Sequence, residues 1–391
     1  LTYEDVTNVD SVGLITARSG IIIGSATTLS VDNIFTTGII TATSLSVNGI
    51  DIGRGLAAVA TNTAVGNNAL DANTSGSNNT AIGDESLGAN TEGSNNTAVG
   101  SLALDENTTG GRTTAVGYRS LSSQTTGSEN VAVGSYALDY NTTGTQNTAV
   151  GESALGANTT AGNNTAVGHD ALKTNSTGQY NTAVGSLALD ANTTASENTA
   201  IGYNALSANT TGTRNTAIGL GALRDNTADN NTAVGREALK VNTSGEQNVA
   251  VGSLALDANT TASYNTAIGY DTLSANTTGI VHTALGWGAL KTNTTGSENT
   301  SCGANSMYYN TTGSYNTAVG RQSLTNNTTA NYNTGLGYRT LFDNTTGTQN
   351  TAVGANALDT NTTADNNTAV SYVALTANTT GTKNTAVRAG A

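Results

Sequence analysis

The chain has 391 residues, of which 36% are hydrophobic and 10% are charged, with 46 glycines, no proline and a formal net charge of −13. Globular domains carry more apolar and many more charged residues, and disordered chains combine low hydrophobicity with high charge density, so neither class fits. Only 14 residues are Lys or Arg, which argues against nucleic acid as a partner, and no run of 18 apolar residues exists for membrane insertion. The chain starts at Leu1 without a signal peptide, and we expect it to be a piece of a longer protein.

Residues 1–56 differ from the rest of the chain because they are richer in Ile, Val and Leu. The segment GLITARS at 13–19 is echoed by GIITATS at 38–44. Such β-branched runs, bounded by glycine or polar residues, predict short strands. A segment this short buries little core alone, so we expect residues 1–56 to form a β-rich shaft or connector.

Residues 57–391 are a tandem repeat. The motif NTAVG returns every 17 residues from Gly66, except for one 16-residue step from Gly219 to Gly235, and Ser371 and Arg388 replace the last two glycines. The segments NTAVG and ALxxNTTG predict two short strands per repeat, joined by Asn and Gly turns. The expected fold class is all-β, a parallel β-solenoid (β-roll) of about nineteen 17-residue coils that rises about 90 Å, with degenerate last coils.

Two positions predict the core when each repeat is numbered from its glycine as position 0. Position 16, represented by Val184, is Val, Ile or Leu except at Cys302, and position 4, represented by Leu189, is Leu except at Met307. We assign all four residues to the core, Cys302 and Met307 as packing residues. Two large side chains per coil, at about 1.5–3 kcal/mol each, compare poorly with a backbone entropy of about 1–2 kcal/mol per residue, so we expect a parallel homotrimer.

Two further positions predict the turns. Asn192 at position 7 and Asn198 at position 13 have Asn counterparts in every repeat except at Gln124, Thr113 and His282. Asparagine tolerates left-handed turns, and identical amides on successive coils form hydrogen-bonded ladders. We therefore expect Asn192 and Asn198 to belong to turn ladders.

Catalytic and metal chemistry have little support. His169 and His282 are the two histidines, about seven coils or roughly 30 Å apart in a solenoid, so we expect neither an enzyme nor a cofactor. Calcium is the better inorganic candidate, but alternate coils carry Gly, Ser or Lys at position 5, and we expect a solvated acidic edge instead. The aspartates at position 5 are Asp71, Asp105, Asp139, Asp190, Asp257 and Asp359.

Aromatic residues recur at positions 1 and 12. Their counterparts in other coils are Ser, Glu, Gln, Arg and Asn, so both columns are expected to face solvent. Exposed aromatic rings among hydrogen-bonding residues can bind sugars or protein receptors, although neutral drift explains the same pattern. The candidate recognition residues are Tyr118, Tyr203, Tyr270, Trp287 and Tyr338 at position 1 and Tyr180, Tyr264, Tyr315 and Tyr332 at position 12.

The repeat NTAVGxxALxxNTTGxx resembles the coils of phage tail-fibre proteins and of trimeric adhesins, whose heads are parallel β-rolls with a shorter motif. Residues 1–56, which begin LTYEDVTNVDSVGLITARSG, are similar to segments of marine cyanophage structural fibre proteins. The resemblance implies a homotrimer on the virion surface or otherwise extracellular. Its partners would be other virion proteins and a host surface glycan or protein receptor.

The sequence therefore predicts a non-enzymatic tail or head fibre of a phage virion, acting as an elongated spacer or a host-attachment adhesin. One alternative is a Thr-rich solenoid that binds ice or another surface, against which the NTT segments count, since they lie beside turn-forming Asn. A second alternative is a surface or matrix fibre of a cell, which shares the architecture and differs in origin.

Overall fold

The computed structural model describes residues 44–47, 50–55 and 59–388 of the chain. Residues 43–391 form one compact unit, and every regular element in its described parts is a strand. Residues 1–43, which include the predicted strand at 13–19 and all but the last residue of the predicted strand at 38–44, lie outside the described residues.

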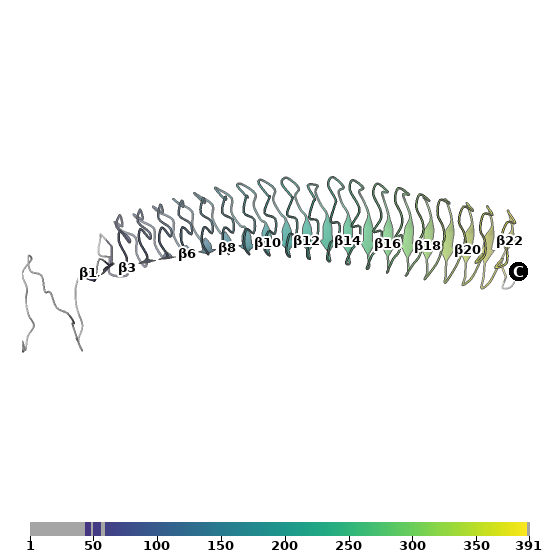
Figure 1. The fold of residues 1–391 in the computed structure, drawn as a ribbon, viewed down its shortest axis with the longest axis horizontal. Coiled ribbons are helices and arrows are strands. Elements are labelled where there is room, and N and C mark those ends of the chain that lie inside the picture. The colour runs from purple at the N-terminus through teal and green to yellow at the C-terminus, as the bar shows by residue number, and fades with distance from the viewer. Residues whose placement is uncertain (1–43, 48–49, 56–58, 389–391) are drawn as a thin grey trace, which may run out of the picture. The chain divides into compact units, whose positions relative to one another are not determined.

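One short strand per coil builds a single parallel sheet along the solenoid (Figure 1). In β10, for example, Thr182 and Ala183 lie opposite Thr199 and Ala200 of β11. The prediction of a parallel β-solenoid of about nineteen coils is thus confirmed. The strands are β1 Ser44–Val47, β2 Ile50–Gly53, β3 Thr63–Val65, β4 Thr80–Ile82, β5 Thr97–Val99, β6 Thr114–Val116, β7 Val131–Val133, β8 Thr148–Val150, β9 Thr165–Val167, β10 Thr182–Val184, β11 Thr199–Ile201, β12 Thr216–Ile218, β13 Thr232–Val234, β14 Val249–Val251, β15 Thr266–Ile268, β16 Thr283–Leu285, β17 Thr300–Cys302, β18 Thr317–Val319, β19 Thr334–Leu336, β20 Thr351–Val353, β21 Thr368–Val370 and β22 Thr385–Ala386.

The second predicted strand of each coil is absent from the described residues, and turns take its place. Leu187, Leu189 and Glu197, at positions 2, 4 and 12, have left-handed backbones with φ of 57°, 54° and 63°. A residue in that conformation interrupts a strand. The amides of the turns still bond to neighbouring coils, because the Leu189 N–H donates to the Ala205 carbonyl and the Leu187 N–H to the His169 carbonyl, both at 3.0 Å.

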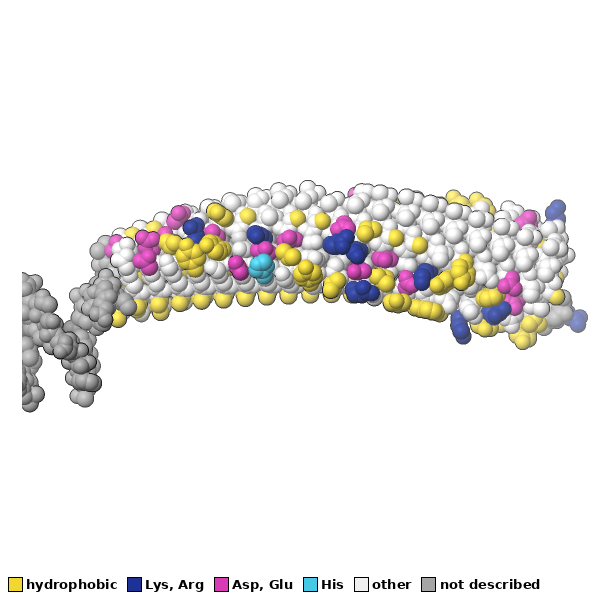
Figure 2. Space-filling view, viewed as in Figure 1, with side chains coloured by type: hydrophobic (Ala, Val, Ile, Leu, Met, Phe, Trp, Pro, Cys, Tyr) yellow, Lys and Arg dark blue, Asp and Glu magenta, His cyan; other side chains and the backbone are white. Residues whose placement is uncertain are grey.

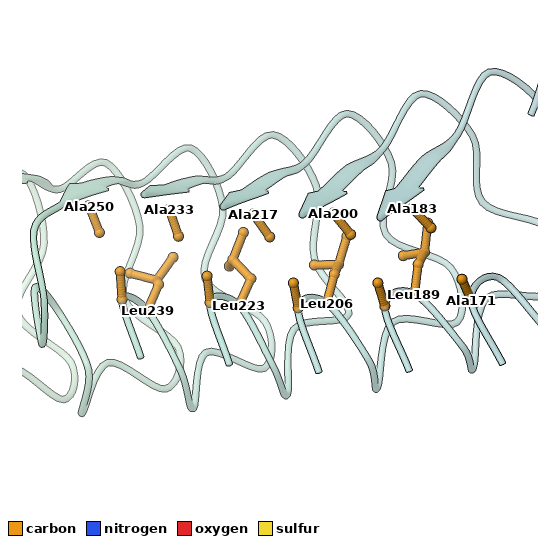
Figure 3. Close-up of a cluster of buried hydrophobic side chains, with 14 of the residues drawn as sticks. Ala171, Ala183, Leu189, Ala200, Leu206, Ala217, Leu223, Ala233, Leu239 and Ala250 are labelled. Carbon is orange, nitrogen blue, oxygen red and sulfur yellow. The ribbon is translucent and has the colours of Figure 1, made fainter. Parts of the chain in front are cut away.

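The apolar interior is narrow and contains two alanines and one leucine from a typical coil. Ala183 comes from the strand. Ala188 and Leu189 come from the turns at positions 1–6 opposite the strand, which we call the turn wall. All three are fully buried. Figure 3 shows Ala183, Ala200 and Ala217 pointing from successive strands toward the leucines of the opposite wall. Met307 takes the place of this leucine in its coil and is also fully buried.

The structure corrects the assignment of Val184 and Cys302 to the core. Both lie on the outer side of the sheet and are partly exposed, and the next counterpart, Ile201, is 38% exposed. Side chains alternate between the two faces of a strand, so a three-residue strand can point either its middle residue or its two outer residues inward. Here Ala183 points inward, which leaves Thr182 and Val184 outside.

Two buried asparagine ladders run beside the apolar interior. The Asn192 side-chain amide donates to the Asn175 side-chain oxygen at 2.7 Å and to the Ala195 carbonyl at 3.0 Å. The Asn198 amide donates to the Gly212 carbonyl at 2.9 Å, while its oxygen accepts the N–H of the residue one coil further on. Each ladder therefore fixes a turn and also joins one coil to the next.

An antiparallel hairpin covers the N-terminal edge of the parallel sheet. β1 pairs with β2, and β2 pairs with β3, which places Ile52 opposite Val65 and Gly53 opposite Ala64. Covering an open edge removes a row of free backbone donors and acceptors that would otherwise pair with another chain.

Replacing Leu189 by Ala should lower the local free energy of unfolding by roughly 2–5 kcal/mol, because it leaves a cavity in a closely packed interior. Hydrogen exchange of the coils on either side would measure this local opening. Leu187→Ala is the matched control, since Leu187 has the same left-handed backbone and is only half-buried. Equal protection loss in the two variants would contradict the assigned interior.

Candidate functional site

The outer side of the sheet forms a regular two-column surface, which we call the sheet face. It consists of position 14, which is Thr except at Val131 and Val249, and position 16, which is Val, Ile or Leu except at Cys302. Parallel in-register pairing places like residues opposite each other, for example Thr182 opposite Thr199. Figure 2 shows a continuous row of hydrophobic side chains along the lower edge, on the side where Figure 1 draws the strands.

The two histidines lie in unrelated environments. His169 is exposed, and its Nδ1 atom is 3.7 Å from a carboxylate oxygen of Asp170. His282 is buried in the position 13 ladder, where its Nε2 lies 2.6 Å from the Gly296 carbonyl and its Nδ1 accepts the Asn299 N–H at 3.3 Å. The neutral imidazole thus replaces an asparagine amide bond for bond, and burial lowers the pKa of His282 to about 4.

The aspartates at position 5 do not converge on a metal-binding cluster. Among the described residues, no three His, Cys, Asp or Glu side chains are grouped so that they could hold a metal ion. Asp139 accepts a hydrogen bond from Ser122 and pairs with Arg119 at 3.4 Å. Asp190 and Asp257 each have one buried oxygen without a hydrogen-bond partner in the described part of the chain, and burial raises the pKa of Asp257 to about 6. The unpartnered oxygens and the raised pKa are therefore properties of individual aspartates and not of a group of ligands.

The aromatic residues of positions 1 and 12 lie on the surface, and their side chains are between 45% and 60% exposed. Two of them form a stacked pair on consecutive coils, because the ring centroids of Tyr315 and Tyr332 are 4.9 Å apart and the rings are nearly parallel. The others are spread along the solenoid. The nine residues are Tyr118, Tyr203, Tyr270, Trp287, Tyr338, Tyr180, Tyr264, Tyr315 and Tyr332.

A first surface hollow, of about 380 Å³, combines aromatic and charged side chains. Its lining includes Tyr136 and Tyr140 together with Arg119, Asp139 and Lys173. Tyr118 packs edge-on against Tyr136 with ring centroids 5.4 Å apart. Tyr136 and Tyr140 could not be singled out from the sequence, because they stand at positions 2 and 6, where aromatic residues do not recur regularly.

A second hollow, of about 460 Å³, spans four coils and is lined by aromatic and uncharged polar residues. We call it the aromatic hollow. Tyr308 and Tyr309 pack edge-on in it, with ring centroids 4.7 Å apart, and Trp287 is the one predicted recognition residue that it contains. Its eight lining residues are Trp287, Asn305, Tyr308, Tyr309, Gln322, Thr325, Asn326 and Phe342.

Comparisons of this chain with protein-family models, with curated proteins and with solved structures found no match. In the described part of the chain, no helix is long and apolar enough to cross a membrane.

The free energy of unfolding should fall as the pH drops from about 6.5 to about 4, because His282 takes up a proton in the unfolded chain before it does so in the folded one. Its folded pKa of about 4 lies below its ordinary 6.5, so the unfolded chain binds more protons between these values. The stabilisation is complete above about 6.5 and is lost toward about 4, at about 1.4 kcal/mol per pKa unit or roughly 3 kcal/mol in all.

Urea unfolding of the wild type and of His282→Asn at pH 7 and pH 4.5 would measure this difference. The variant restores the asparagine of the ladder and should lose less stability at pH 4.5 than the wild type. His169→Asn is the control, because His169 is exposed and its replacement should leave the wild-type pH dependence intact. Equal pH dependence in the wild type and His282→Asn would contradict the prediction.

Proposed function

We propose that this protein is a non-enzymatic structural fibre that assembles as a parallel homotrimer through its sheet face and serves on a phage virion as a spacer and attachment element. The observation that carries the assembly is the aliphatic column at position 16. Nine of its members are 37–41% exposed although they belong to a contiguous row. These nine are Ile82, Val133, Val150, Val167, Ile201, Ile218, Ile268, Val319 and Leu336.

The length of this row favours burial against a partner. Coils rise about 4.8 Å each, so the row extends for about 90 Å along the solenoid. Soluble monomers rarely expose contiguous apolar patches larger than a few hundred Å², and larger ones mark interaction surfaces. Covering the row would also supply the apolar burial that an interior of two alanines and one leucine per coil lacks.

A second copy of the same chain fits this surface best. Positions 14 and 16 carry Thr, Val, Ile, Leu or Cys throughout strands β3 to β21, so no charged side chain lies on the sheet face of these strands despite the net charge of −13. Parallel copies therefore meet without like-charge repulsion, and their columns have the same spacing. The number of three copies and the virion setting are supported by the resemblance of the repeat and of residues 1–56 to fibre proteins.

Three lysines in consecutive strands should dissociate the assembly. In the variant Val184→Lys, Ile201→Lys and Ile218→Lys the charges would be buried without partners at the interface, while in a single chain they remain solvated. Light scattering after size exclusion should give about three times the chain mass of 39.1 kDa for the wild type and one chain mass for the variant.

The matched control carries Ser186→Lys, Tyr203→Lys and Leu220→Lys, which adds the same charge two residues further along in each case, at position 1. This control should remain trimeric. A wild-type mass of one chain would refute the assembly, and a trimer that survives the three sheet-face lysines would place the interface elsewhere.

Ice binding is a second candidate, and one structural observation favours it. The strands place a Thr column and an aliphatic column side by side at a regular spacing on the sheet face, away from the Thr residues of the turns. A surface covered by partner chains cannot also face ice. The fibre proposal therefore predicts no thermal hysteresis, and hysteresis that is abolished by Thr182→Lys with Thr199→Lys would establish ice binding in its place.

A further inference from the structure

The aromatic hollow lies in coils that depart from the repeat both on the surface and in the interior. In the other coils position 5 is a small or charged residue, but Tyr308 and Phe342 occupy it here, and Tyr309 stands at position 6. The interior beneath also changes, since Met307 replaces the leucine and Ser306 replaces an alanine. Because surface and interior change together in these coils, the hollow differs from the single aromatic residues that are scattered along positions 1 and 12.

A glycine makes room for the hollow. Gly288 stands at position 2 with φ of 63°, where a Cβ atom would lie 2.8 Å from the Asn305 side-chain oxygen and 3.1 Å from the Tyr308 ring. A 2.8 Å contact is closer than side-chain atoms tolerate, so a larger residue at 288 would displace Asn305 or Tyr308. Gly288 therefore leaves room for the Tyr308 ring and the Asn305 amide to lie together on the turn wall.

The hollow offers hydrogen-bonding groups that are not used within the chain. The side-chain oxygen of Asn305 is buried and has no hydrogen-bond partner among the described residues. A buried acceptor without a partner costs about 1–3 kcal/mol, which a ligand hydroxyl could recover. The Gln322 amide lines the same hollow and provides a further donor and acceptor. The Asn326 amide also lines it; its NH2 group donates to an Asp343 carboxylate oxygen at 3.2 Å, and its oxygen is a further acceptor.

Charge is balanced around the hollow. None of the eight lining residues is ionised at neutral pH. The cations of Lys291 and Arg339 lie over the Tyr308 and Phe342 rings, and each is paired with a carboxylate. Lys291 lies 2.6 Å from an Asp271 oxygen and Arg339 lies 3.4 Å from an Asp359 oxygen. A phosphate or sulfate group would therefore have to compete with these carboxylates, whereas an uncharged ligand with many hydroxyl groups meets both rings and amides.

We infer that the aromatic hollow is a binding site for a neutral saccharide, a pyranose ring of a glycan chain. The apolar faces of such a ring pack on the exposed rings of Trp287 and Tyr309, and its hydroxyl groups bond to Asn305 and to the amides of Gln322 and Asn326. A volume of about 460 Å³ lies within the range of small-ligand sites. Each chain carries a complete site, so the inference deepens the attachment role proposed above without needing the assembly.

The chain's one tryptophan makes the site directly measurable, because all indole fluorescence comes from Trp287. The full chain would be titrated with D-glucose, D-galactose, D-mannose, L-rhamnose, N-acetyl-D-glucosamine and short oligosaccharides of each, none of which absorbs at the excitation wavelength. At least one probe should change the emission in a saturable way. The variants Tyr309→Ala and Asn305→Ala should weaken that binding about ten-fold or more.

Tyr372→Ala is the matched control, since Tyr372 is an exposed tyrosine of the array that lines neither hollow. It should bind as the wild type does. No saturable response to any probe would overturn the site, as would undiminished binding by Tyr309→Ala. A trimer without saccharide binding would refute the site and leave the fibre intact, while a monomer with saccharide binding would refute the assembly and leave the site intact.

Discussion

Stacking of identical coils is the constraint on which the rest of this structure depends. The interior of each coil holds two asparagine side chains beside its few apolar ones, and a buried amide is costly unless it is fully hydrogen-bonded. The Asn192 amide finds its partners in Asn175, one coil away, and in Ala195 of its own coil. These bonds exist only when successive coils are in register, so the 17-residue period is itself the stabilising device. Identity at the ladder positions follows from this requirement, whereas exposed positions such as 1 and 12 vary from coil to coil.

The same close stacking of coils explains why glycine stands at position 0. Gly185 has φ of 133°, and a Cβ atom there would lie 2.6 Å from the Gly202 carbonyl of the next coil. Close stacking also explains how leucines tolerate left-handed backbones at positions 2 and 4, because their amides donate to the coils before and after. A strained conformation that would be rare in an isolated turn is thus held by bonds on both sides.

The period, the all-β class and the strand at NTAVG could be predicted from the sequence because they follow from repetition and residue type. The side of the strand that faces inward could not, since hydrophobicity favours Val184 for the core while the narrow gap beneath the turn wall admits only Ala183. The prediction of a second strand was wrong for a related reason. Leu187 and Leu189 carry no glycine or asparagine signal for the left-handed backbone that they adopt, and neighbouring coils impose it. Most of the aromatic hollow was beyond prediction because Trp287, Tyr308 and Phe342 come together only when four coils are stacked.

The shortened repeat shows which parts of a coil are free to change. One residue is missing between Asn226 and Asn231, yet the Asn226 amide still reaches the Ala228 carbonyl at 2.8 Å, and Thr232 still pairs with Thr216. The corner absorbs the deletion because the position 13 ladder keeps its register, with the Asn231 N–H donating to the Asn215 side-chain oxygen at 2.9 Å. The position 7 ladder loses one rung there, where the Asn209 side-chain oxygen accepts the Gly212 N–H at 3.0 Å instead. Exposed positions on the turn wall can also change without loss of register. Aromatic and amide side chains therefore surround Trp287 while the sheet face stays regular. The two proposals therefore rest on different parts of the coil: assembly is proposed for the repeated sheet face, and recognition for a few neighbouring coils that depart from the repeat.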